Sequence, residues 1–96
     1  MNKVEISKVK EAASRLSDVA SLTPLTLNFN KTKEFDAKIY FKREDLQQVR
    51  SYKIRGAYNK ITSLSEDELV NGVVCASAGN HAQGVAYACY KKKINF

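Results

Sequence analysis

The spacing of apolar residues along the chain predicts an alternation of helices and strands. Over residues 5–20 apolar side chains recur every three or four positions, which predicts an amphipathic helix. Thr23-Pro24 ends this helix and leads into a short extended piece at 25–27. The next stretch, "NFNKTKEF" at 28–35, has the length of one or two helical turns.

A strand and two helices are predicted in the middle of the chain. The stretch "AKIYFK" at 37–42 alternates its side chains between two faces, as a strand does. A polar connection then leads to a helix over 52–64, which Ser51 can cap. Gly56 weakens this helix and leaves space for another backbone or a cofactor. A shorter helix follows, with Ser65 as its cap and three acidic residues in its first turn.

The last quarter of the chain predicts a strand, a helix and the beginning of another strand. The continuous apolar run "GVVCAS" at 72–77 is typical of a parallel strand that is covered on both faces. A helix is predicted over 79–92, and "INF" at 94–96 starts the next strand. A narrow face of small residues lets this helix pack closely on a sheet: Ala82, Val85, Ala86 and Cys89.

This alternation favours an α/β fold, in which flanking helices cover a parallel sheet. Ligands of such sheets bind at the carboxyl ends of the strands, where the loops after 37–42 and 72–77 lie. Two or three parallel strands cannot cover both faces and both edges of their sheet. We therefore expect residues 1–96 to be the first, incomplete part of a larger domain.

Composition and charge exclude several classes of protein. The chain carries a net charge of +6, but its basic residues are mixed with acidic ones, and no basic-aromatic nucleic-acid motif accompanies them. The one basic run, at 91–93, suits the C-terminal end of a helix. We therefore expect no nucleic-acid partner, whereas a site for a phosphate or carboxylate remains compatible with the charge.

Metal binding and cellular location can be predicted from the cysteines, the single histidine and the N-terminus. Cys75 and Cys89 have no metal-binding spacing and His81 is the only histidine, so we expect no metal site and two buried free thiols. The first 22 residues lack the apolar core of a signal peptide, and no stretch is apolar enough to span a membrane. The sequence therefore predicts a cytoplasmic protein with no membrane partner.

The stretch "ASAGNHAQG" at 76–84 forms a turn between a predicted strand and a predicted helix. It lacks the Lys and Ser/Thr of a Walker A loop and the glycine spacing of a dinucleotide-binding loop. A glycine-containing turn that enters a helix presents free N–H groups and the positive end of the helix dipole, which suits a carboxylate or phosphate. Alternatively, Ser77 or Asn80 only caps the helix.

Lys53 lies at the start of the second predicted helix, with Arg50 and Arg55 close in sequence. The helix dipole and the like charges both disfavour the ammonium form. A partly neutral lysine is what Schiff-base chemistry needs. The alternative is a solvated lysine on a basic helix start, and the residues alone leave both interpretations open.

Two long stretches, "KREDLQQVRSYKIRGAYNKI" at 42–61 and "CASAGNHAQGVAYA" at 75–88, together resemble the threonine ammonia-lyases, also called threonine dehydratases. The resemblance extends from about Leu22 to the end of the chain. It implies a fold-type II pyridoxal-phosphate enzyme of the tryptophan-synthase-β group. Residues 1–96 would then be the N-terminal part of its catalytic domain.

The resemblance assigns roles to residues of both motifs. Lys53 matches the catalytic lysine that forms a Schiff base with pyridoxal 5'-phosphate, and Tyr52 replaces the usual Phe beside it. Asn80 matches the partner of the cofactor's phenolic oxygen. The family's glycine-rich loop for the cofactor phosphate lies beyond Phe96. The turn that holds the carboxylate of the amino-acid substrate corresponds to Ser77, Gly79, Asn80 and His81.

By this resemblance the parent enzyme converts L-threonine to 2-oxobutanoate and ammonia, in isoleucine biosynthesis or threonine catabolism, and is a homo-oligomer. Serine dehydratases and serine racemases share the same motifs, so they remain alternatives. A further alternative is a non-catalytic fragment. Because the phosphate loop is missing, we expect the 96-residue chain by itself to be inactive.

Overall fold

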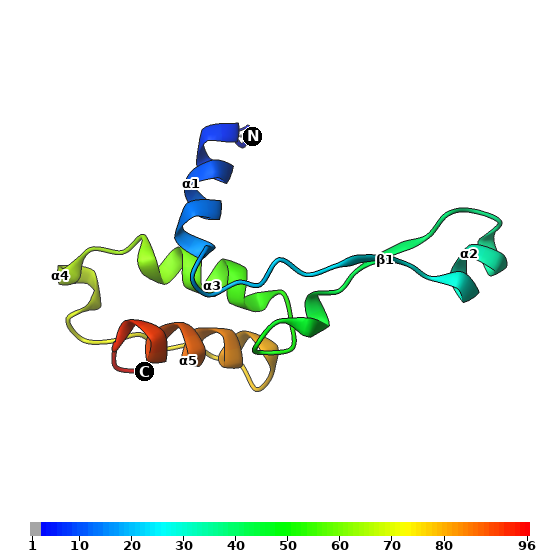
Figure 1. Cartoon of the computed structure of the whole chain (residues 1–96). Coiled ribbons are helices and arrows are strands. Elements are labelled where there is room, and N and C mark those ends of the chain that lie inside the picture. Colours follow the sequence, from blue (N-terminus) through cyan, green and yellow to red (C-terminus); the bar gives the residue numbers. More distant parts are fainter. Residues whose placement is uncertain (1–2) are drawn as a thin grey trace.

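The computed structural model describes residues 3–96. Helices and short strands alternate as far as β2, and only helices follow it (Figure 1). They are α1 (Ile6–Leu16), β1 (Leu25–Leu27), α2 (Phe29–Phe35), β2 (Tyr40–Lys42), the 3-10 helix η1 (Glu44–Leu46), α3 (Lys53–Thr62), α4 (Glu66–Leu69) and α5 (Asn80–Lys92).

The helices form where the sequence predicts them, with ends that local hydrogen bonds determine. α1 is shorter than the predicted 5–20, because the N–H of Ser17 bonds only three residues back and the helical pattern stops there. At the start of α4, Ser65 is the predicted cap, and it forms a capping box with Glu68 through reciprocal bonds to each other's N–H group. α5 ends in the basic run, where Lys93 takes a left-handed conformation with φ 56°.

The sheet is an antiparallel pair. Leu25 of β1 lies opposite Lys42 of β2, and α2 fills the connection between the two strands. Asn28 caps α2 by accepting a hydrogen bond from the N–H of Lys31. Residues 25–42, which we call the arm, reach away from the other helices (Figure 1). The two N-terminal strands are therefore a hairpin and do not belong to a parallel sheet within this chain.

The predicted parallel strand over 72–77 is extended chain without strand pairing. One backbone hydrogen bond joins it to the predicted last strand, from the N–H of Val73 to the carbonyl of Asn95 at 2.9 Å. A strand needs a neighbour along its length, and within the described residues nothing flanks Val74, which is 93% exposed. The parallel sheet is therefore not confirmed here, although the α/β character is.

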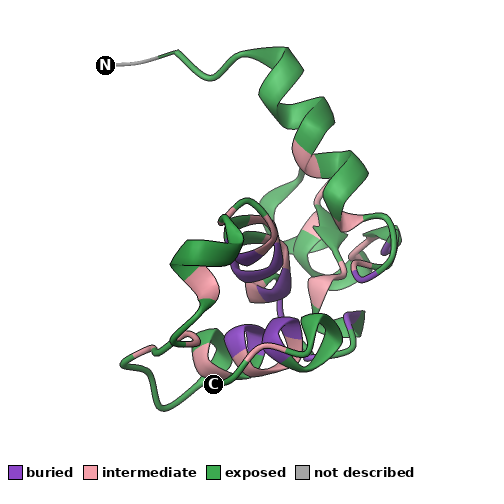
Figure 2. Ribbon diagram, turned by 90° about the vertical axis from the view of Figure 1, so that its left-hand side faces the viewer, coloured by how far each residue is buried: buried purple, intermediate pink, exposed green. Residues whose placement is uncertain are grey.

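The core lies between α3 and α5, whose facing sides are buried (Figure 2). Ile54 and Ala88 are completely inaccessible at the centre of this contact. The predicted small-residue face of α5 is rotated, because Ala82 and Ala86 are only half-buried. The residues that α5 buries are Gly84, Val85, Ala88 and Cys89.

Much of the remaining surface is open. The chain exposes 7539 Å² of accessible surface, whereas a compact protein of 10.8 kDa exposes about 5500 Å². The arm and α1 account for this shape, since both stand away from the paired helices in Figure 1. Large apolar side chains on the arm, such as Leu25, Phe29 and Phe35, are mostly exposed. These surfaces are available for packing against further protein.

Both cysteines are free thiols, but only Cys89 is buried, whereas Cys75 is half-buried. Burial, with a smaller contribution from Cys75, raises the pKa of the Cys89 thiol. Between residues 3 and 96, no helix has the length and apolar character needed to cross a membrane. The same residues hold no cluster of three or more His, Cys, Asp or Glu side chains that could bind a metal ion.

Candidate active site

The two sequence motifs meet where α3 and α5 begin. The helices lie side by side and run in the same direction, so their N-terminal ends are at the same end of the pair (Figure 1). Lys53 is the first residue of α3 and Asn80 is the first residue of α5. The turn at 77–79 precedes Asn80 directly. Two helix dipoles therefore direct their positive ends toward one region.

Gly84 brings α5 into direct contact with Lys53. A methyl carbon built on Gly84 would lie 3.1 Å from the carbonyl carbon and 3.2 Å from the carbonyl oxygen of Lys53, and 3.3 Å from the nitrogen of Ile54. Sequence reasoning singled out Gly56 for such a close approach, but a methyl carbon there would meet nothing within 4 Å. The sequence indicated Gly84 only through its position in the second motif, one helical turn after Asn80.

The amine of Lys53 has no hydrogen-bond or ion-pair partner among residues 3–96. It lies 5.1 Å from the centre of the Tyr52 ring, and no carboxylate lies within ion-pair distance of it. The backbone N–H of Lys53 donates to the hydroxyl oxygen of Ser51 at 3.4 Å, which is a weak form of the predicted cap. An amine that is half-accessible and unpaired suits a reaction with a carbonyl group.

The turn before α5 is organised by the Ser77 hydroxyl. Its oxygen accepts hydrogen bonds from the N–H groups of Gly79 at 3.3 Å and Ala82 at 3.2 Å. Ser77 therefore satisfies one N–H group in the first turn of α5, as a capping side chain does, although the N-cap position itself is occupied by Gly79. Within the described chain, the N–H groups of Asn80 and His81 have no acceptor. The turn thus combines a cap with two unsatisfied donors at a helix start, which suits an anion.

The side chains of the turn are exposed at the end of the helix pair. The Asn80 side chain forms no hydrogen bond with the described residues, so its amide remains able to donate and accept. His81 borders a hollow of about 220 Å³ between α3, α5 and the extended chain at 73–75. A free amine, an amide and N–H donors at helix starts are together the groups that a carbonyl compound with anionic oxygens needs. This donor set fits pyridoxal phosphate.

Arg55 does not act on Lys53 as an uncompensated like charge, contrary to the expectation from the sequence. Arg55 is engaged by Glu44, with its Nε 2.8 Å and its second nitrogen 2.9 Å from the carboxylate. Its charge is therefore compensated. Arg50 is exposed at the surface and takes a left-handed conformation with φ 61° in the turn before α3.

Glu44 is the centre of a polar network that fastens the start of α3. Its carboxylate also accepts from the Thr23 hydroxyl at 2.6 Å and the Gln47 amide at 3.2 Å. Hydrogen bonds, above all from Arg55, lower the pKa of Glu44 to about 2, although partial burial opposes this shift. The completely buried Gln47 also bonds both backbone groups of Ser21. The network joins three segments of the chain next to Lys53, and sequence reasoning did not identify it.

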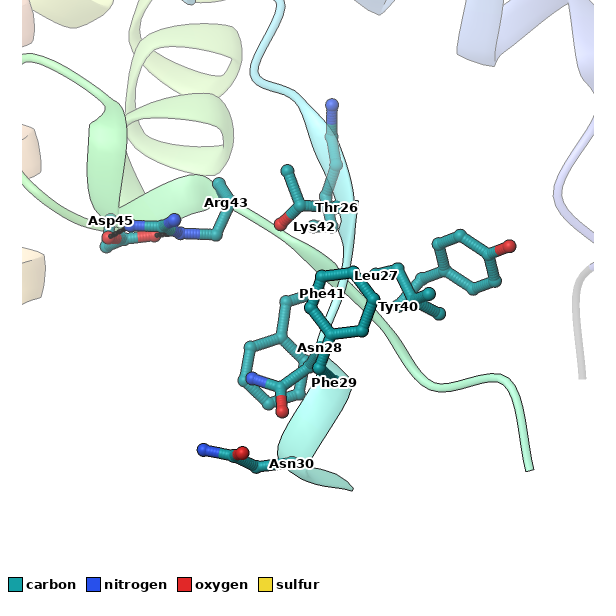
Figure 3. A pocket seen from close by; sticks show the side chains of 10 residues that line it. All are labelled: Thr26, Leu27, Asn28, Phe29, Asn30, Tyr40, Phe41, Lys42, Arg43 and Asp45. Atoms are coloured by element: carbon teal, nitrogen blue, oxygen red, sulfur yellow. Dashed lines mark hydrogen bonds and ion pairs between the residues drawn. The ribbon is translucent and has the colours of Figure 1, made fainter. Parts of the chain in front are cut away.

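A larger open hollow of about 860 Å³ lies along the arm (Figure 3). Side chains from both strands and the start of α2 line it, including Phe29 and Phe41. Arg43 and Asp45 form an ion pair of 2.8 Å at its border. Three lining residues, Lys42, Arg43 and Asp45, belong to the first motif, but Arg43 and Asp45 pair with each other and Lys42 bonds the carbonyl of Thr23. Neither Lys53 nor the turn at 77–81 lines this hollow.

Comparisons with known proteins agree with both motifs. The family model described as "Pyridoxal-phosphate dependent enzyme" matches residues 16–96. The chain is 51% identical to the L-threonine dehydratase biosynthetic IlvA of Halalkalibacterium halodurans over 98% of its length, which is 23% of that protein. It is also 51% identical to the protein of the same name from Staphylococcus aureus over 96% of its length, which is 22% of that protein.

Similar solved structures include related enzymes. Threonine deaminase isoform 2 of Solanum lycopersicum superposes with a TM-score of 0.76 at 39% identity, covering 97% of this chain and 27% of that chain. The serine racemase of Dictyostelium discoideum superposes with a TM-score of 0.87 at 39% identity, covering 96% of this chain and 30% of that one. The chain thus spans about a quarter of the length of the curated relatives it matches.

Proposed function

Since the chain belongs to the family of pyridoxal-phosphate dependent enzymes, we propose that an enzyme built on it deaminates L-threonine to 2-oxobutanoate and ammonia. The observation that carries this proposal is the 51% identity to biosynthetic threonine dehydratases across both motifs. We call the complete enzyme any protein of the relatives' length that contains residues 1–96, such as the H. halodurans relative with its matching segment exchanged for this one.

In the complete enzyme, Lys53 would hold the cofactor through its amine and then serve as the base. When bound, pyridoxal phosphate supplies an electron sink next to the Cα of the amino acid. The amine of Lys53 would also take the Cα proton of the substrate. Loss of the β-hydroxyl as water and hydrolysis of the released enamine give 2-oxobutanoate and ammonia. The free amine at the start of α3 supports this role.

The turn before α5 would hold the substrate. The unsatisfied N–H groups of Asn80 and His81 and the hydroxyl of Ser77 are available to the carboxylate. The Asn80 side chain would donate to the cofactor's phenolic oxygen. Gly79, where a methyl carbon would meet nothing within 4 Å, leaves room for this approach. By fixing the carboxylate, the turn would hold the Cα–H bond in line with the Lys53 amine.

Serine chemistry is the second candidate function. The Dictyostelium serine racemase superposes with a TM-score of 0.87, so similarity of fold supports a serine enzyme as well as it supports a threonine enzyme. Assays of the complete enzyme with L-threonine and L-serine separate the two. We expect 2-oxobutanoate from threonine. Formation of pyruvate or D-serine from serine, without threonine turnover, would contradict the substrate proposal.

Borohydride reduction tests the role of Lys53 directly. Reduction of the complete enzyme should fix the cofactor on Lys53, and peptide mass spectrometry should locate it there. Lys60 is the matched control, because it is an exposed lysine of the same helix. A label on a lysine other than Lys53 would contradict the catalytic assignment.

The remaining properties of the complete enzyme are part of the same proposal. Residues 1–96 would form the N-terminal part of its catalytic domain, and the extended chain at 72–77 would join a parallel sheet there. The enzyme would be cytoplasmic and homo-oligomeric, without nucleic-acid or membrane partners. The role in isoleucine biosynthesis is favoured over threonine catabolism by the names of the relatives.

The 96-residue chain alone should be inactive and poorly soluble or partly unfolded. It lacks the glycine-rich loop that the family uses for the cofactor phosphate, and it exposes Val74 and the apolar residues of the arm. A cofactor titration followed by borohydride labelling tests this expectation. Stoichiometric labelling of Lys53 in the short chain, with threonine turnover, would overturn it.

A further inference from the structure

We propose that Gly84 is a positioning residue, which sets the separation between the Lys53 amine and the turn at 77–81. This inference rests on the proposed function, because it assumes that both elements act on one substrate. Gly84 itself touches neither substrate nor cofactor in this proposal. It acts through the contact between α5 and the backbone of Lys53.

The contact leaves no room for a side chain. Gly84 is buried, and a methyl carbon there would lie 3.1–3.3 Å from three backbone atoms of Lys53 and Ile54. At such distances the neighbour must yield by a few tenths of an ångström. The atoms that would have to move are backbone atoms, and Ile54 beside them is completely buried. The two helices would therefore separate, since no flexible side chain is present to rearrange.

A displacement at Gly84 is transmitted to the turn. Asn80 precedes Gly84 by four residues, so both lie on the same side of α5, one turn apart. The hydroxyl of Ser77 bonds the N–H of Ala82, which ties the turn to the first turn of the helix. The turn and Gly84 consequently move as one body.

Lys53 is held independently on the other side of the contact. Two residues further along α3, Arg55 is bound through two nitrogens to Glu44, which is itself fixed by Thr23. The start of α3 is therefore anchored to η1 and to the chain before β1, neither of which belongs to α5. A shift of α5 changes the separation between the two motifs instead of carrying Lys53 along with it.

Helix propensity gives a second reason to regard Gly84 as a functional requirement. Glycine is less favourable than alanine inside a helix because of its backbone entropy. Gly84 lies well inside the 13-residue helix α5 and has no left-handed conformation that would require glycine. The close approach to Lys53 is the feature of the structure that explains a glycine at this position.

The test is the variant Gly84→Ala in the complete enzyme. A small change in the separation of the reacting groups should lower kcat about fivefold, whereas KM for L-threonine should change less, because the turn itself stays intact. The visible circular dichroism band of the Lys53-bound cofactor should also change, since the Asn80 amide moves relative to the ring. Gln83→Ala is the control, because Gln83 is the exposed neighbour of Gly84 on the same helix.

The outcomes separate the possible explanations. Unchanged kcat and an unchanged dichroism band in Gly84→Ala, at full cofactor occupancy, would overturn the positioning role. If Gly84→Ala does not fold, Ala88→Gly alters the same helix contact one turn further along α5 without adding a side chain, and a native band in that variant would equally overturn the positioning role. Failure of the proposed function has a different signature, because the unmodified complete enzyme would then neither form 2-oxobutanoate nor be labelled on Lys53.

Discussion

The helix pair α3 and α5 and the arm at 25–42 differ in how far their apolar residues are buried. Ile54 and Ala88 are completely buried between the helices, whereas Phe29 and Leu25 on the arm are 78% and 64% exposed. Every apolar residue at the centre of the helix pair finds its partner within the 96 residues. The arm has apolar residues of the same kind without such partners. The framework of the candidate site is therefore built into this segment, whereas the apolar residues of the arm are left exposed by it.

The largest loss of stability is expected when a side chain at the centre of the contact between α3 and α5 is truncated. Ile54→Ala should lower the free energy of unfolding by about 2–5 kcal/mol, because it leaves a cavity between backbones that cannot close. Ile54→Val, a matched smaller truncation, should cost about 0.5–1.5 kcal/mol. Hydrogen exchange of α3 and α5 amides in the complete enzyme measures both. Equal and small effects would show that the contact is not the core of the site.

The second largest effect is expected from acid, which should weaken the Glu44 network that holds the start of α3. The pKa of Glu44 is lowered in the folded state from 4.5 to about 2, so the ionised carboxylate stabilises the fold. This contribution is complete above pH 4.5 and is lost as the pH falls from about 4.5 to 2. Because Glu44 and Arg55 are partly exposed, we expect about 1–3 kcal/mol.

Denaturant unfolding of the complete enzyme at several pH values measures this loss. Glu44→Gln should lower stability at pH 7 and flatten the dependence between pH 4.5 and 2. Glu66→Gln is the control, because Glu66 is exposed and forms no ion pair with residues 3–96. The same acid dependence in Glu44→Gln would mean that other groups produce it.

The helices, including α2, were predictable because helix signals are local. The acidic first turn and cap of α4 and the basic end of α5 each act within four residues of sequence. The strand at 72–77 was not confirmed because its pairing depends on neighbours that the sequence pattern cannot supply. An apolar run predicts that a segment is buried, but it does not indicate which other segment packs against it.

The residues of the candidate site stay a prediction from the motifs, whereas the contacts that support them were not predicted. Lys53 and Asn80 were identified from motifs, and the structure brings their helix starts to one end of the pair. The contact of Gly84 and the network around Glu44 were missed, because each depends on residues far apart in sequence meeting in space. The charge argument for Arg55 failed for the same reason, since its partner lies eleven residues away.

Two substitutions in the turn should have smaller, separable effects. Asn80→Ala in the complete enzyme should change the cofactor's absorption spectrum, because the phenolic oxygen loses its partner. Ser77→Ala should mainly raise KM for threonine and remove the cap on α5, which costs about 1 kcal/mol. Ser77→Thr keeps the oxygen and should restore the cap. If spectrum and kinetics are unchanged in both alanine variants, the turn is only a helix cap.

The smallest effect is expected on the arm, where it measures what the segment lacks. Phe29→Ser in the complete enzyme should cost more than about 1 kcal/mol, because we expect further protein to cover the ring, which is 78% exposed in residues 3–96. Denaturant unfolding of the complete enzyme measures this cost. A cost below about 0.5 kcal/mol, as for an exposed side chain, would mean that the arm stays exposed in the complete enzyme. Its contrast with the helix pair would then be a property of the finished fold.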